Sequence, residues 1–372
     1  MSLNHRIAKE LKSREDNNSL RTLVIPEGVD FSSNDYLGLA RIHHNLPLVA
    51  SGSGGSRLLS GNYSSIENLE MQLAKHGNTD AGLIFGSGYA ANLGFFSCVC
   101  KRGDIILFDQ LVHASIRDGI RMSNASGYGF AHNDFAALES LLIKHIEVTV
   151  FVALEGVYSM DGDNPDVEEL KRLHEKYGFY LVIDEAHSFG LMGDQGAGWV
   201  SHYALDELVF AKIITFGKAM GCDGAAILGS ADLRNYLINF SRPFIYTTAP
   251  SPHKVALMQK QFDTLRGIEN RNVVAAQLKS HFVESMHGQG ELITGEWGNI
   301  AGLVIGGNDR TRAVSAFLQK KKLVVKAVLS PTVPLGTERL RICFHEYNTA
   351  QELELLIKNL KEALEIFKEE KN

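Results

Sequence analysis

Continuous apolar runs alternate with amphipathic segments through the middle of the chain. The run VTVFVALE (148–155) has almost no polar position, which is typical of a strand buried on both faces. The segment VEELKRLHEKY (167–177) then shows helical spacing, with Asp166 placed to cap its start and Gly178 to end it. The next apolar run is YLVIDEAH (180–187). This order predicts a β-α-β unit.

Other apolar runs extend this pattern into a mostly parallel α/β sheet with crossover helices. Four more strands are expected, at AGLIF (81–85), DIILFD (104–109), ELVFAKIITF (207–216) and GAAILG (224–229).

The pattern changes near Leu265, where a helix is expected to begin. GLVIGG (302–307) and LRICFH (340–345) follow as strands, and a last helix starts with the T-x-x-E capping box of Thr349 and Glu352. We therefore expect an N-terminal helix and arm (1–35), a large domain (36–265) and a smaller α+β domain (266–372).

Composition narrows the functional classes. The 372 residues carry a formal net charge of -6, so no general basic field favours nucleic acid or an anionic membrane. The N-terminal segment lacks a signal-peptide core, and no apolar run reaches membrane-spanning length. Four scattered cysteines favour reduced thiols over a disulfide framework or a zinc site. We expect a cytoplasmic protein with no nucleic-acid or membrane partner.

A glycine-rich loop follows the strand expected at 81–85. It has the form G-x-G-x-x-A from Gly86 to Ala91 and opens an apparent helix, with Asp109 about 20 residues on. Taken alone, this spacing indicates a dinucleotide such as NAD.

Two motifs favour a different chemistry. In TFGKAMG, Lys218 follows a buried strand, where an amine of depressed pKa can form a Schiff base. In VIDEAHS, Asp184 ends a strand and His187 follows; this pair suits the nitrogen and the phenolic oxygen of a pyridine ring. A solvent-exposed lysine, a helix-capping aspartate and a D-x-x-H metal pair remain alternatives. The metal pair lacks a third ligand of clear spacing, so we expect no metal.

Convergence strengthens the chemical interpretation. The carboxyl ends of parallel strands meet in one crevice, where ligands bind. Gly88, His113, Ser159, Asp184 and Lys218 each come shortly after an expected strand. We therefore expect their side chains or backbone to face a single site.

The motifs, in their order and approximate spacing, resemble those of the α-oxoamine synthases, which are fold-type-I pyridoxal-phosphate enzymes. The resemblance covers about residues 5–365. It rests on SNDYLGL, GSGGSRLLSGN, SGYAAN, HAS, EGVYSMDGD, DEAHS, TFGKAMG and PTVPLGTERLRI.

The resemblance implies that the glycine-rich loop holds the phosphate of pyridoxal 5'-phosphate, through the backbone N–H groups of Gly88 and Tyr89. The match to an NAD fingerprint is then a false positive. The remaining implied cofactor contacts are Lys218 as the Schiff-base lysine, Asp184 on the pyridine nitrogen, His187 on the ring oxygen, His113 on the ring face, Thr215 on the phosphate and Ser159 beside the cofactor.

The resemblance also implies a homodimer with active sites at its interface, because Thr247 and Thr248 match residues that reach the neighbouring subunit's phosphate. Four residues are implied for the substrates: Arg341 and Asn34 for the amino-acid carboxylate, Arg21 near the acyl-thioester entrance, and Thr332 on the substrate side of the site.

The implied reaction is the condensation of an amino acid with an acyl thioester, followed by decarboxylation, with Lys218, His113 and Asp184 as the catalytic residues. Three motifs, FAHND, RPFIYTT and SPTVPLGTERLRICFHEYNT, favour the biotin-pathway branch, which uses L-alanine and a pimeloyl thioester. The carrier, coenzyme A or an acyl carrier protein, stays open. Ile66 stands where many relatives have a histidine, which leaves the acyl preference open.

The alternatives differ in class. Glycine C-acetyltransferase, 5-aminolevulinate synthase and serine palmitoyltransferase share the chemistry but use other substrates. A non-catalytic subunit with the same fold is disfavoured, because it would not need Lys218. An NAD-dependent dehydrogenase rests on Gly86 to Ala91 and Asp109 alone and leaves Lys218 without a role.

Overall fold

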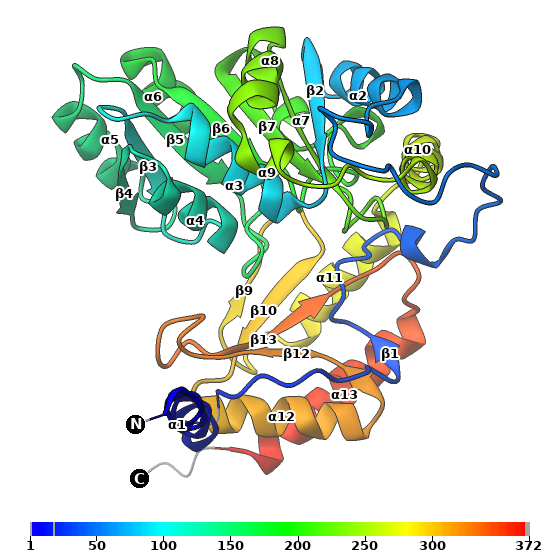
Figure 1. The fold of residues 1–372 in the computed structure, drawn as a ribbon. Helices are drawn as coiled ribbons and strands as arrows, with labels where there is room; N and C mark the ends of the chain where they lie inside the picture. The colour runs from blue at the N-terminus through cyan, green and yellow to red at the C-terminus, as the bar shows by residue number, and fades with distance from the viewer. Residues whose placement is uncertain (1, 18, 369–372) are drawn as a thin grey trace. The chain divides into compact units, whose positions relative to one another are not determined.

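The chain packs as two compact units (Figure 1). The structure, a computed structural model, describes residues 2–17 and 19–368. The larger unit consists of Leu37–Ser159 and Asp163–Arg271. The smaller unit combines the residues up to Tyr36, the short segment Met160–Gly162 and the residues from Asn272 on.

A seven-stranded sheet forms the centre of the larger unit, in the order β2-β8-β7-β6-β5-β3-β4. Among these strands, β8 is antiparallel to both neighbours and the other pairings are parallel, which confirms the mostly parallel α/β sheet. The strands are β2 (Ala81–Phe85), β3 (Ile105–Asp109), β4 (Ser126–Phe130), β5 (Val150–Glu155), β6 (Tyr180–Asp184), β7 (Val209–Thr215) and β8 (Ala225–Gly229).

Helices cover both faces of this sheet. Side chains alternate between the two faces of the sheet along a strand. Ala211 and Ile213 of β7 therefore pack on one face, in the hydrophobic core that also contains residues of α3. Lys212 points to the other face, where its side chain reaches the end of α2. The helices are α2 (Ser64–His76), α3 (Gly88–Val99), α4 (Ala114–Met122), α5 (Phe135–Lys144), α6 (Val167–Tyr177), α7 (Trp199–His202), α8 (Ala231–Phe240), α9 (Arg242–Ile245) and α10 (Pro252–Arg266), with short 3-10 turns η1 (Leu39–Arg41), η2 (Asp194–Gly196) and η3 (Asp206–Leu208).

Local chemistry sets the central β-α-β unit as expected. All six residues of β5 are buried. The side chain of Asp166 accepts hydrogen bonds from the backbone N–H groups of Glu168 and Glu169, which starts α6. Gly178, with a φ of 65°, ends α6 in the left-handed conformation that glycine adopts without strain.

A four-stranded antiparallel sheet in the order β12-β13-β10-β9 and three long helices build most of the smaller unit. A separate parallel pair joins β1 to β11, so the N-terminal arm is tied to the C-terminal part of the chain. The elements are α1 (Leu3–Asp16), β1 (Val29–Asp30), α11 (Val273–Ser285), β9 (Leu292–Ile293), β10 (Ile300–Val304), α12 (Asn308–Lys320), β11 (Leu323–Val324), β12 (Lys326–Val328), β13 (Arg339–Cys343) and α13 (Ala350–Ile366).

The ends of two helices in this part of the chain illustrate what the sequence pattern captures. The capping box of Thr349 and Glu352 starts α13 as expected. The helix expected to begin near Leu265 begins instead at Val273. Near Leu265 the preceding helix, α10, comes to its end, and Asn272, with a φ of 61°, holds a left-handed conformation just before α11.

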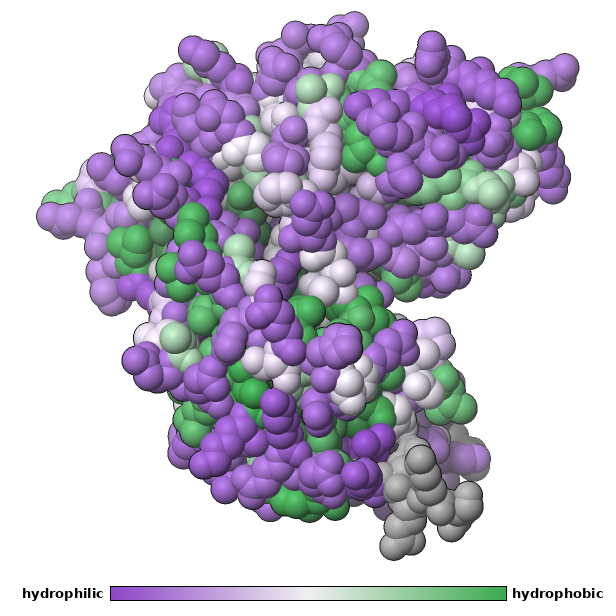
Figure 2. Space-filling model, turned by 180° about the vertical axis from the view of Figure 1, so that it is seen from behind, coloured by the Kyte–Doolittle hydropathy of each residue, from purple (hydrophilic) through white to green (hydrophobic). Residues whose placement is uncertain are grey.

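The surface view in Figure 2 shows a mostly hydrophilic face with scattered hydrophobic side chains. Within the described ranges, no helix combines the length and the apolar character needed to cross a membrane. The four cysteines are free thiols.

Candidate active site

Six strands of the larger unit end at the same edge of the sheet. β3, β4, β5, β6 and β7 are mutually parallel, and β2 runs in their direction because β8 is antiparallel to both β2 and β7. Their last residues are Phe85, Asp109, Phe130, Glu155, Asp184 and Thr215. This carboxyl edge is the place that the sequence predicts for the active site.

Lys218 and His187 meet beyond this edge. Lys218 follows β7 in a tight turn, in which the backbone N–H of Gly221 donates to the carbonyl oxygen of Lys218 at 2.8 Å. Lys218 Nζ lies 2.7 Å from His187 Nε2. The amine expected to form the Schiff base and one of the expected ring contacts are therefore neighbours.

Asp184 and His113 are connected through two residues that the sequence analysis did not assign. Asn92 Nδ2 donates to Asp184 Oδ2 at 2.8 Å and to Ser115 Oγ at 3.0 Å. Ser115 Oγ lies 2.7 Å from His113 Nδ1. His113 also caps α4, since its Nδ1 accepts from the backbone N–H of Ser115 at 3.2 Å.

Glu155 joins two of the expected loops. One carboxylate oxygen accepts from the backbone N–H of His113 at 2.7 Å, and the other accepts from the backbone N–H of Ser159 at 3.2 Å. Burial, followed by the neighbouring charge of Asp184, raises the pKa of Glu155 to about 8. Through its two hydrogen bonds, the carboxyl group of Glu155 holds the backbone at His113 and Ser159, two of the expected cofactor contacts.

The start of α3 has the features of a phosphate cradle. A Cβ atom added to Gly88 would lie 2.5 Å from Thr215 Cγ2, so only glycine lets the backbone come this close to β7. Thr215 Oγ1 is buried and has no hydrogen-bond partner in the part of the chain that the structure describes. A helix N-terminus beside a buried hydroxyl suits an anionic group, and these residues fit the phosphate of pyridoxal phosphate.

Other expected contacts of the larger unit lie on its surface. Tyr89 is exposed, and its hydroxyl donates to the carboxylate of Asp118; the expected phosphate contact is its backbone N–H and stays a prediction. Thr247 and Thr248 follow α9 in an exposed turn. Their expected role at a subunit interface stays a prediction.

The expected substrate residues belong to the smaller unit. Arg341 is buried on β13; its guanidinium donates to Asn34 Oδ1 at 3.0 Å and to Cys343 Sγ at 3.0 Å, so Arg341 and Asn34 are brought together as expected. Arg21 and Thr332 are exposed. Their roles stay predictions.

Ile66, the departure from the family pattern, is fully buried in α2. It packs as a core residue of the larger unit.

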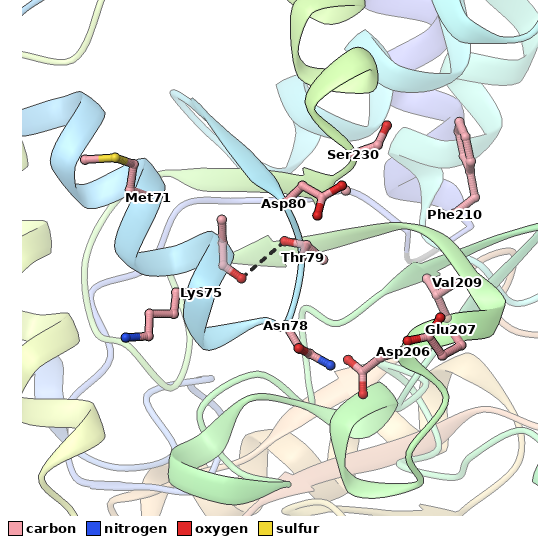
Figure 3. Close-up of a pocket in the computed structure, with 12 residues that line it drawn as sticks. Met71, Lys75, Asn78, Thr79, Asp80, Asp206, Glu207, Val209, Phe210 and Ser230 are labelled. Carbon is pink, nitrogen blue, oxygen red and sulfur yellow. Dashed lines mark hydrogen bonds between the residues drawn. The ribbon is translucent and has the colours of Figure 1, made fainter.

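A hollow of about 690 Å³ lies elsewhere on the larger unit (Figure 3). Its lining includes Asp80, which precedes β2, Val209 at the start of β7 and Gly229 at the end of the antiparallel β8. These positions mark the amino edge of the parallel strands, opposite the edge that carries Lys218. Asp206, also in the lining, is paired with the buried Lys212. We therefore assign this hollow no part in the chemistry.

Comparisons with known proteins identify the family of the chain. The model of a family described as aminotransferase class I and II matches residues 26–360. The 8-amino-7-oxononanoate synthase of Emericella nidulans is 35% identical over 387 residues, which cover 95% of this chain and 94% of the relative. The enzyme of the same name from Lysinibacillus sphaericus is 32% identical over 380 residues, with 96% and 98% covered.

Solved structures share the fold. The serine palmitoyltransferase of Sphingomonas wittichii superposes with a TM-score of 0.90 at 23% identity, covering 99% of both chains. The crystal structure of 8-amino-7-oxononanoate synthase from Francisella tularensis gives a TM-score of 0.79 at 25% identity, covering 91% of this chain and 98% of the other. The chain thus belongs to the aminotransferase class I and II family and, within it, to the 8-amino-7-oxononanoate synthases of the α-oxoamine synthase group.

Proposed function

We propose that the chain catalyses the condensation of L-alanine with a pimeloyl thioester, with loss of carbon dioxide, to give 8-amino-7-oxononanoate for biotin biosynthesis. It is a pyridoxal-phosphate-dependent acyltransferase. The observation that carries the proposal is the cluster of Lys218, His187, Asp184 and His113 at one edge of the sheet, in a chain 32–37% identical to synthases of this name.

When bound, pyridoxal phosphate supplies an electron-withdrawing ring that stabilises negative charge on the substrate's α-carbon. The protein must hold that ring and keep its nitrogen protonated. The buried carboxylate of Asp184 suits the proton on the pyridine nitrogen, since a nearby negative charge favours the charged form. Gly88 and Thr215 suit the phosphate, and His187 suits the ring oxygen.

Lys218 has two tasks in this proposal. Its amine anchors the cofactor, and once displaced by the substrate amine it removes the proton from the α-carbon. We assign to His113 a hydrogen bond to the oxygen that becomes negative when the thioester carbonyl is attacked.

The smaller unit supplies the proposed contacts to the substrates. Arg341 binds the carboxylate of L-alanine, because a guanidinium can hold two carboxylate oxygens with parallel hydrogen bonds. Asn34 holds the guanidinium in place. We assign Arg21 to the entrance for the acyl thioester and Thr332 to the substrate side of the site.

We further propose a homodimer in which Thr247 and Thr248 reach the phosphate of the neighbouring subunit, and a cytoplasmic location. The thioester carrier is coenzyme A or an acyl carrier protein. An NAD-dependent reaction is disfavoured, because it leaves the Lys218 and His187 pair without a task.

The test combines a spectrum with a product assay. The purified protein, loaded with pyridoxal phosphate, is mixed with pimeloyl-coenzyme A and with L-alanine, glycine or L-serine in turn. We expect the visible cofactor band to change with L-alanine, and thiol release to require L-alanine. Lys218→Ala serves as the inactive control. Turnover with glycine or L-serine instead would favour a sibling synthase, and a protein that cannot bind pyridoxal phosphate would overturn the proposal.

A further inference from the structure

A series of hydrogen bonds, buried except at its His113 end, runs from Asp184 to His113. It passes from Asp184 Oδ2 through Asn92 Nδ2 and Ser115 Oγ to His113 Nδ1, with distances of 2.8, 3.0 and 2.7 Å. Ser115 is fully buried and Asn92 nearly so. The two intermediate residues come from different helices, α3 and α4, and neither belongs to the expected active-site set.

The chemistry of the groups fixes the direction of the two hydrogen bonds that Asn92 makes. A carboxylate only accepts hydrogen bonds, so the Asn92 atom facing Asp184 is the amide nitrogen. That nitrogen also donates to Ser115 Oγ, which leaves the serine hydroxyl proton free to point at His113 Nδ1. The opposite orientation of the amide would place its oxygen against a carboxylate oxygen.

His113 Nδ1 therefore faces two donors. The Ser115 hydroxyl lies at 2.7 Å, and the backbone N–H of Ser115 donates from 3.2 Å. In a neutral imidazole one nitrogen carries the proton and the other accepts. A nitrogen that accepts from two donors is the unprotonated one.

We infer that Asn92 and Ser115 are positioning residues that hold neutral His113 in the tautomer with its proton on Nε2. The inference rests on the proposed function, in which His113 donates to an oxyanion. Without these hydrogen bonds, His113 could place the proton on Nδ1 and present a bare Nε2, which would repel that oxygen. These hydrogen bonds thus make His113 Nε2 a donor. They also connect the imidazole ring to the carboxylate of Asp184, which is assigned to the pyridine nitrogen.

The surroundings of His113 favour its neutral form, for which the choice of tautomer matters. Burial lowers the pKa of His113; the charge of Asp184 acts in the opposite direction, and that of Lys218 adds to the decrease. The backbone of His113 is fixed as well, because its N–H donates to Glu155 at 2.7 Å.

The tautomer can be measured directly. The two nitrogen signals of His113 in isotope-labelled protein separate the forms in a long-range proton–nitrogen correlation spectrum, with His113→Gln used for assignment. The spectrum is recorded on the full chain before and after pyridoxal phosphate is added. We expect the Nε2–H form in both states. In Ser115→Ala and in Asn92→Ala we expect signals of the Nδ1–H form to appear.

Kinetics supply the second readout. Losing the hydroxyl, the nearer of the two donors at Nδ1, should lower kcat roughly tenfold in Ser115→Ala, about the worth of one hydrogen bond, with little change in the KM for L-alanine. Ser115→Thr keeps the hydroxyl and should restore kcat and the tautomer. Ser140→Ala, which removes an exposed serine hydroxyl on α5, is the matched control and should leave both unchanged.

The outcomes separate the inference from the proposed function. An Nδ1–H form in the unmodified protein, or an unchanged tautomer in both Ala variants, would overturn the inference whatever the activity. A tautomer that shifts in the variants, in a protein that turns over none of the amino acids, would support the hydrogen-bond chain and overturn the function.

Discussion

Lys218 Nζ and His187 Nε2 lie 2.7 Å apart, at the ends of two neighbouring strands of the larger unit. One atom of this pair must donate and the other accept, so the contact orients the amine of Lys218. Lys218→Arg keeps a positive charge but removes the primary amine. We expect the lysine-linked visible band to disappear and kcat to fall by about a thousandfold or more.

Absorption spectra and thiol release check this prediction. Lys254→Arg, at an exposed lysine paired with Asp223, is the matched control and should behave like the unmodified protein. Retained turnover in Lys218→Arg would remove Lys218 from the mechanism.

Thr215 should contribute to cofactor affinity through its hydroxyl. Its Oγ1 is buried and has no hydrogen-bond partner within the described ranges, as expected of an atom that binds a phosphate oxygen. Thr215→Val keeps the shape and removes the donor. Because a hydrogen bond to a charged group is worth about 1.5–3 kcal/mol, we expect the dissociation constant of pyridoxal phosphate to rise roughly ten- to a hundredfold. Equilibrium dialysis measures it, and Thr264→Val on α10 is the control; equal affinities would contradict the assignment.

Arg341 should act on the amino acid rather than on the thioester. Its guanidinium is held by Asn34 and Cys343, a planar arrangement that lysine cannot reproduce. For Arg341→Lys we expect the KM for L-alanine to rise at least about tenfold, equivalent to about 1.4 kcal/mol, with the KM for the thioester nearly unchanged. Arg266→Lys, at a surface arginine, controls for charge-preserving change. A selective rise in the thioester KM would place Arg341 on the acyl side instead.

His132 should make stability depend on pH. Its Nδ1 lies 3.0 Å from Asp109 and its Nε2 lies 2.7 Å from Asp163. Burial lowers the pKa of His132, but the hydrogen bonds and charges of Asp109 and Asp163 outweigh burial and raise the pKa to about 10. The unfolded value is near 6.5, so the folded state binds the extra proton between these values.

Stability from His132 is therefore fully present below about pH 6.5 and is lost as the pH rises through about 10. Urea unfolding at fixed protein concentration should show a decline across this window that is shallower in His132→Gln. At pH 7 we expect this variant to be about 2–3 kcal/mol less stable than the unmodified protein, because two charge-assisted hydrogen bonds are weakened. Parallel pH profiles for both proteins would contradict the assignment of the proton to His132.

How far the sequence predicts the site depends on how each residue acts. Lys218 and Asp184 stand out because a charged residue after a buried strand needs a reason to be there. Glu155 also ends a buried strand, but the sequence analysis treats it as the last residue of the apolar run and assigns it no role. Asn92 and Ser115 act only through hydrogen bonds to residues distant in sequence, and only the folded chain brings them together.

The fold is easier to predict from the sequence than the site, because hydrophobic runs and helix caps are local features of the sequence. Asp166 and Gly178 mark both ends of α6 correctly. The late start of α11 was missed because it depends on the left-handed backbone at Asn272, a conformation that no pattern of apolar residues records. The expected domain boundaries at 35 and 265 stay predictions.

The smaller unit is assembled from both ends of the chain and from three residues in its middle, which has a consequence for synthesis on the ribosome. β1 can pair only after β11 has been synthesised. Asp161 can form its ion pair only after Arg339, which lies 178 residues later in the sequence, has been synthesised. β1 is thus synthesised well before the strand with which it pairs. A chain that stops before β11 leaves the larger unit's strands complete but deprives the N-terminal arm of its strand partner, and it exposes apolar surface that invites aggregation.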